Sequence, residues 1–164
     1  MSGSNRSPVL VVGIGNPDRG DDGVGPAVAW RLSVRVPPGV CVLERSGDAL
    51  ALIEDWRDFS CVILVDAGAP ITKPGRIHRL DLNNSPLPMS LALRSTHAFG
   101  LAETVELARG LLRLPPRLVA YLIEGEQFET GAPLSPMVTK AVEEVAERIV
   151  AEISAVLEAG RDHA

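Results

Sequence analysis

The most constraining feature of the sequence is a stretch near its start, residues 9–25, which reads VLVVGIGNPDRGDDGVG. Its first four residues, 9–12, are all apolar, which is typical of a strand buried on both faces of a parallel sheet. Gly13, Gly15 and Asn16 follow, and these residue types allow a sharp turn at the carboxyl end of the strand. Ligands of open α/β sheets bind outside the carboxyl ends of the strands, so this turn is a candidate site.

The turn carries three carboxylates, from Asp18, Asp21 and Asp22. They would repel a phosphate, and the turn lacks both the glycine pattern of a dinucleotide fingerprint and the Gly-Lys-Ser/Thr of a P-loop. A small nucleotide-binding domain is therefore disfavoured. Clustered carboxylates instead favour a cation or general acid–base chemistry. The alternative is a purely structural turn in which Asp21 or Asp22 caps the next helix.

The rest of the chain alternates strand patterns with helical ones. Strands are expected at residues 9–14, 40–43, 61–65, 75–82 and 118–123, and helices at about 21–36, 47–56, 98–112 and 136–158. Trp30 and Leu50 are among the side chains expected to pack in the core. The strand at 75–82 is the most polar and is placed at an edge of the sheet. This alternation predicts an α/β protein, a three-layer α/β/α sandwich around a twisted, mostly parallel sheet of about five strands.

Length and charge limit the possible organisation and partners. The 164 residues are expected to form one domain over 9–159, with a disordered tail over 1–8 and a short C-terminal tail over 160–164. The net charge of −5, without a cluster of Lys and Arg, argues against nucleic acid or a membrane as partner. No secretory signal or membrane-spanning run is present, so we expect a cytoplasmic protein. Cys41 and Cys61 lie in apolar runs and are expected to be small buried hydrophobes.

Three residues could form a metal site at the carboxyl edge of the predicted sheet. Asp22 follows the first strand, Asp66 follows the third, and His97 precedes the helix of 98–112. Two carboxylates and an imidazole suit a first-row metal with open positions for substrate or water. Taken singly, Asp66 could instead cap a turn and His97 could be an exposed loop residue. No other catalytic grouping stands out, and His78 is expected to lie on the surface of the edge strand.

Three segments of the chain resemble signatures of the nickel–iron hydrogenase maturation proteases. Residues 13–16 (GIGN) with 20–25 (GDDGVG) resemble the opening signature, 63–67 (ILVDA) resembles a strand that ends in Asp-Ala, and 95–101 (STHAFGL) resembles a Ser-x-His-x-x-Gly-Leu segment. The segments occur in the family's order, and the resemblance covers nearly the whole chain. It implies a small α/β/α endopeptidase, an enzyme activator that removes the C-terminal extension of a hydrogenase large-subunit precursor after nickel insertion.

The resemblance also implies roles for particular residues. Asp22, Asp66 and His97 would contact nickel, which would be the substrate's own and could be replaced at the site by other divalent cations. Asp22 and Asp66 would also be catalytic, in an aspartic-type or metal-assisted hydrolysis. Many members carry Glu where Asp22 stands, and Asp-Gly-Gly-Thr where this chain has Glu-Arg-Ser-Gly at 44–47. The alternative function is a non-enzymatic, nickel-dependent chaperone or checkpoint protein for the same precursor.

Overall fold

The computed structural model describes residues 9–85 and 100–161, so the predicted tail over 1–8 lies outside the described residues. The strands are β1 (Val9–Ile14), β2 (Cys41–Arg45), β3 (Cys61–Gly68), β4 (Ile77–Asp81) and β5 (Arg117–Glu124). A 3₁₀ turn, η1 (Gly20–Gly23), precedes the helices α1 (Val24–Ser33), α2 (Ala49–Asp55), α4 (Leu101–Gly110) and α5 (Pro136–Arg161). The predicted order of strands and helices is therefore confirmed.

The five strands form one sheet in the order β2-β1-β3-β5-β4. Neighbouring strands are parallel except β4, which runs antiparallel to β5 and lies at an edge, as its polar sequence predicted. β1 and β3 are buried along nearly their whole length, because strands in the middle of a covered parallel sheet need apolar side chains on both faces. The predicted sheet of about five mostly parallel strands is confirmed.

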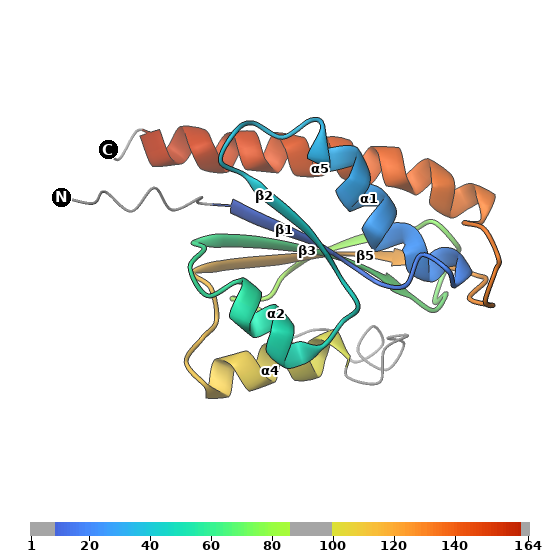
Figure 1. Ribbon diagram of the computed structural model, residues 1–164, viewed down its shortest axis with the longest axis horizontal. Helices are drawn as coiled ribbons and strands as arrows, with labels where there is room; N and C mark the ends of the chain where they lie inside the picture. Colours follow the sequence, from blue (N-terminus) through green and yellow to red (C-terminus); the bar gives the residue numbers. More distant parts are fainter. Residues whose placement is uncertain (1–8, 86–99, 162–164) are drawn as a thin grey trace.

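Helices cover both faces of the sheet, which confirms the three-layer sandwich. Figure 1 shows α1 and α5 on one face and α2 and α4 on the other. Alternate residues of β3 supply the two cores: Ile63 and Val65 belong to the core under α1 and α5, whereas Val62 and Leu64 belong to the core under α2 and α4. Among the helices that the structure describes, none contains an apolar stretch of the length that a membrane span requires.

Two side chains that were predicted to be in the core are exposed instead. Trp30 on α1 is 72% exposed and Leu50 on α2 is 66% exposed. α1 buries the side that carries Val28 and Leu32, which are four residues apart, and Trp30 lies between them on the opposite side of the helix. The prediction for the cysteines is confirmed for Cys61, which is buried, whereas Cys41 on the edge strand β2 is only partly buried.

The helix α5 runs along the whole sheet (Figure 1) and continues to Arg161, beyond the predicted end at residue 158. Its Glu152 side chain is only 9% exposed and holds the helix to the sheet. The Tyr121 hydroxyl donates a hydrogen bond of 2.5 Å to Glu152, and Arg79 and Arg117 form ion pairs with the same carboxylate. This contact ties α5 to β4 and β5.

The carboxyl ends of β1, β3 and β5 lie together at one edge of the sheet, at the right in Figure 1. The turn into α1, the connection to β4 and the connection to α5 all leave the sheet there. The sequence-predicted site residues that the structure describes are found at this edge.

Candidate active site

The turn after β1 folds back tightly, because glycines stand where no side chain would fit. Gly15 has a φ of +142°, and a Cβ there would lie 1.9 Å from the Asp22 carbonyl oxygen. A Cβ on Gly25, in the first turn of α1, would lie 2.3 Å from the Ile14 carbonyl oxygen and 2.7 Å from that of Val65. The start of α1 therefore rests directly on the ends of β1 and β3.

Asp22 lies in η1, between these two close contacts, and is only 1% exposed. Its Oδ2 accepts a hydrogen bond of 2.9 Å from the backbone N–H of Asn16. The N-cap residue of α1 is Gly23, and no side chain makes a capping hydrogen bond there. The alternative in which Asp22 caps the next helix is therefore wrong, and the carboxylate is instead held against the turn itself.

Asp66 lies near the end of β3 and is 3% exposed. Its Oδ1 accepts a hydrogen bond of 2.8 Å from the backbone N–H of Ala67. The register of β1 on β3 pairs Gly13 with Val65, so Asp66 lies beside the last residue of β1. Because η1 also packs against β3, Asp22 and Asp66 are brought to the same edge of the sheet.

Two buried carboxylates at one edge form an environment that fits a cation. Removing a carboxylate from water costs about 3 kcal/mol or more unless an opposite charge or hydrogen bonds offset that cost. The predicted third ligand, His97, lies outside the described residues, so its approach to Asp22 and Asp66 stays a prediction. In the part of the chain that the structure describes, no three His, Cys, Asp or Glu side chains form a group that could hold a metal.

Asp21 has a role that the sequence did not reveal. Its side chain is fully buried, and its Oδ2 accepts hydrogen bonds from the backbone N–H groups of Glu126 (2.8 Å) and Gln127 (3.1 Å). Its Oδ1 accepts bonds from the backbone N–H and the hydroxyl of Ser135, at 2.7 and 3.0 Å. Asp21 thus binds the connection between β5 and α5 to the turn after β1, and it does not cap α1 either.

Glu124, the last residue of β5, is a second buried carboxylate that holds a loop. It is 2% exposed and accepts hydrogen bonds from the backbone N–H groups of Ile71 (2.5 Å) and Thr72 (2.7 Å). The Thr72 hydroxyl and His78 Nε2 contact its other oxygen at 2.9 and 2.7 Å. Burial raises the pKa of Glu124, but the bonds from His78, Thr72 and Ile71 outweigh burial and lower that pKa to about 2.

The prediction that His78 decorates the surface is wrong. Its side chain is 20% exposed and its ring pairs with Glu124. The sequence held a signal for this network, because Glu124 directly follows an apolar strand just as Asp66 does. An acidic residue directly after an apolar strand is expected at the carboxyl edge of the sheet, whether its role is chemical or structural.

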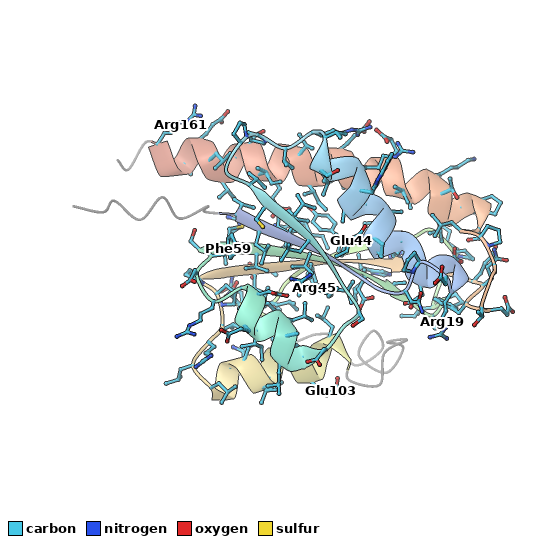
Figure 2. All side chains as sticks on the ribbon, in the orientation of Figure 1. Arg19, Glu44, Arg45, Phe59, Glu103 and Arg161 are labelled. Carbon is cyan, nitrogen blue, oxygen red and sulfur yellow. The ribbon has the colours of Figure 1, made fainter. Side chains whose placement is uncertain are left out.

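The divergent loop at 44–47 is anchored to the same edge. The Arg45 carbonyl accepts a hydrogen bond of 2.9 Å from the backbone N–H of Gly15. Its guanidinium Nε lies 2.7 Å from Asp55 Oδ2, at the end of α2. Figure 2 shows Arg45 between the end of β2 and α2, and Arg19 beside the start of α1. Arg45 therefore links α2 to the turn that carries Asp22.

Comparison with known proteins identifies the family to which the chain belongs. The family model described as hydrogenase maturation protease matches residues 27–152. The chain belongs to the hydrogenase maturation protease family. The protein is accordingly a hydrolase, a protease of hydrogenase maturation.

Individual relatives agree with this assignment. The hydrogenase expression/formation protein HupD of Bradyrhizobium diazoefficiens is 29% identical over 138 residues, which cover 82% of this chain and 72% of HupD. An endopeptidase of Escherichia coli has a solution structure with a TM-score of 0.75 and 26% identity, over 87% of this chain and 90% of that one. The hydrogenase maturating endopeptidase HybD of Escherichia coli shares the fold, with a TM-score of 0.74 and 23% identity over 90% and 93% of the two chains.

Proposed function

We propose that this protease removes the C-terminal extension of a nickel–iron hydrogenase large-subunit precursor after nickel has been inserted, with Asp22 and Asp66 as its catalytic carboxylates. The observation that carries the proposal is the burial of these two carboxylates at one edge of the sheet, in a chain of this protease family. The precursor is the partner, and neither nucleic acid nor a membrane is needed for the reaction.

The chain's own residues would supply the proton transfers of peptide hydrolysis. A carboxylate of Asp22 or Asp66 accepts a proton from water while the water oxygen bonds to the carbonyl carbon. The C–N bond then breaks, and the same carboxylate returns the proton to the leaving amine. Nickel belongs to the substrate in this proposal, and it would contact Asp22, Asp66 and His97 and supply Lewis acidity beside the bond that is cut. Another divalent cation could occupy the same position.

We place the reaction in the cytoplasm. Cys41 pairs in register with Leu10, and Cys61 pairs with Val9, so the cysteines lie on the two strands that flank β1. Both are free thiols. A chain of 164 residues with only two cysteines and no disulfide between them is typical of a protein from a reducing compartment.

The test is cleavage of the precursor by Asp22→Asn and Asp66→Asn variants. Each change removes a charge and keeps the shape and one acceptor oxygen, so the fold should be retained. We expect each variant to cleave at least ~100-fold more slowly, as for loss of a general acid–base group. Asp18→Asn is the matched control, because Asp18 is an exposed carboxylate of the same turn. Wild-type cleavage rates in both variants would contradict the assignment.

A further inference from the structure

A cavity of about 500 Å³ lies between the residues that lead into β4 and the helix α5, and neither Asp22 nor Asp66 lines it. Its lining includes Thr72, Lys73 and Arg76 from the connection, and Glu144 and Arg148 from α5. Three cations therefore face one carboxylate, in a protein whose net charge is −5. The cavity is a local concentration of positive charge on an acidic protein.

Two of the three cations are not neutralised. Arg148 pairs with Glu144 at 2.6 Å. No acidic side chain pairs with Lys73 or Arg76 anywhere in 9–85 and 100–161. An oxyanion that entered the cavity would meet two cations whose charge is not already compensated, and charge-assisted hydrogen bonds of this kind are among the stronger ones in proteins.

Arg76 is held in place by a chain of hydrogen bonds that ends on the buried Glu124. Its Nη1 donates a hydrogen bond of 3.0 Å to the Thr72 hydroxyl, which in turn donates one of 2.9 Å to the buried Glu124 carboxylate. The backbone on both sides is fixed too, since the Gly75 N–H donates to the Glu124 carbonyl (2.6 Å) and the Glu124 N–H donates to the Arg76 carbonyl (3.0 Å). An arginine positioned before its ligand arrives loses less side-chain entropy on binding.

The cavity lies close to the candidate active site along the sheet. Asp66 pairs in register with Leu122 of β5, and Leu122 pairs with His78 of β4. The His78 ring contacts the Glu124 carboxylate, which also accepts from the hydroxyl of Thr72 in the cavity lining. Two strand spacings correspond to ~10 Å, a distance that about three residues of an extended peptide cover. A peptide with its reacting bond beside Asp66 could therefore reach the cavity with a nearby residue.

We propose that this cavity is a specificity site that binds a carboxylate of the precursor's C-terminal segment, through Lys73 and Arg76. The inference rests on the proposed function. A singly charged carboxylate fits better than a phosphate, because Glu144 borders the cavity and Glu124 lies beneath Arg76, so a second negative charge would be repelled. The carboxylate could be an acidic side chain near the cut or the end of the chain.

The variants Lys73→Gln, Arg76→Gln and their combination test the site in precursor cleavage. We expect the double variant to raise KM about five- to tenfold with kcat within about twofold, since a substrate contact remote from the reacting bond contributes to binding. Lys140→Gln is the matched control, because Lys140 is exposed and is the only other lysine in the sequence. Arg161→Gln is the control for the arginine, since Arg161 lies at the far end of α5 (Figure 2). A double variant that folds and keeps the wild-type KM would overturn the proposal.

A second measurement is independent of cleavage. Sodium acetate titrated into ¹⁵N-labelled protein should shift the backbone amides of residues 72–77 in the wild type and not in the double variant. The absence of such shifts in the wild type would overturn the carboxylate site and leave the proposed protease function standing. Precursors with an amidated C-terminus, or with neutral amides in place of acidic side chains near the cut, then show which carboxylate is bound, because only the relevant change reproduces the raised KM.

Discussion

Asp21 and Asp22 are neighbours in the sequence, yet the structure gives them different surroundings. Asp21 is fully buried and accepts hydrogen bonds from Glu126, Gln127 and Ser135, so it holds a loop in place. Asp22 faces the turn after β1, at the same edge as Asp66, where we propose the chemistry occurs. A pattern of two adjacent aspartates cannot separate these roles, because the donors of Asp21 come from residues more than 100 positions away.

Replacing Asp21 by Asn should destabilise the fold. Each Asp21 oxygen accepts from backbone N–H groups, so an amide NH₂ in either position would face a donor and leave buried groups unsatisfied. We expect the free energy of unfolding, measured with urea, to fall by about 2–4 kcal/mol. Asp18→Asn, an exposed change in the same turn, should alter it by less than about 0.5 kcal/mol. Equal stability of the two variants would contradict a structural role for Asp21.

Glu124 should make the stability depend on pH in the acid range. Hydrogen bonds hold the pKa of Glu124 at about 2 in the fold, below its ordinary value of 4.5. A carboxyl whose pKa is depressed by folding stabilises the native state above its unfolded pKa, and this contribution is lost as pH falls from 4.5 to about 2. We expect a loss on the order of 3 kcal/mol over this range.

Urea unfolding of Glu124→Gln between about pH 5 and pH 2.5 measures that contribution, since the variant has no carboxyl to titrate. Its free energy of unfolding should fall less over this range than that of the wild type. Glu158→Gln, an exposed change on α5, should keep the wild-type slope. A Glu124→Gln slope as steep as that of the wild type would show that other groups carry the acid sensitivity.

At the level of the elements, the site depends on how closely α1 approaches the sheet. Gly25 lets the first turn of α1 touch the backbone of both β1 and β3. That contact holds η1, and with it Asp22, beside the end of β3. Two positions where only glycine fits, 15 and 25, thus set where the carboxylates lie.

Gly25→Ala should open this contact. The added Cβ would lie under 3 Å from backbone atoms of Ile14 and Val65, which cannot move aside as a flexible side chain could. We expect a loss of about 3 kcal/mol or more in thermal or urea unfolding, at the upper end of overpacking effects. Gly110→Ala is the matched control, because nothing lies within 4 Å of a Cβ there. In the last turn of α4, Gly110→Ala should raise the free energy of unfolding by up to about 1 kcal/mol. A Gly25→Ala protein that is more stable than the Gly110→Ala protein would contradict this explanation.

The sequence predicted the positions of the helices and strands better than it predicted which of their side chains are buried. The strands were recognisable because strands buried on both faces need unbroken apolar runs, as in 9–12. Trp30 was misplaced because hydrophobicity alone does not show which side of a helix meets the sheet. His78 was misplaced because its partner, Glu124, lies 46 residues further along the chain.

On the scale of the whole molecule, the sheet brings three connections to one edge. Asp21 binds the connection that follows β5, Glu124 binds the one that follows β3, and Arg45 binds the turn after β1. The meeting of Asp22 and Asp66 at this edge could be predicted, because strand direction in a parallel sheet fixes where the strands end. The hydrogen bonds that join these connections could not be predicted, because they link residues far apart in the sequence and follow no local pattern.

We propose that the protein cuts the precursor and that nickel in the precursor permits the cut. The most direct measurement is the intact mass of the nickel-loaded and the nickel-free hydrogenase large-subunit precursor, each before and after incubation with the wild-type protein. We expect a discrete C-terminal peptide to be lost from the nickel-loaded form only. An unchanged mass, in a complex that still forms with the nickel-loaded precursor, would contradict the account and favour a chaperone that binds without cutting.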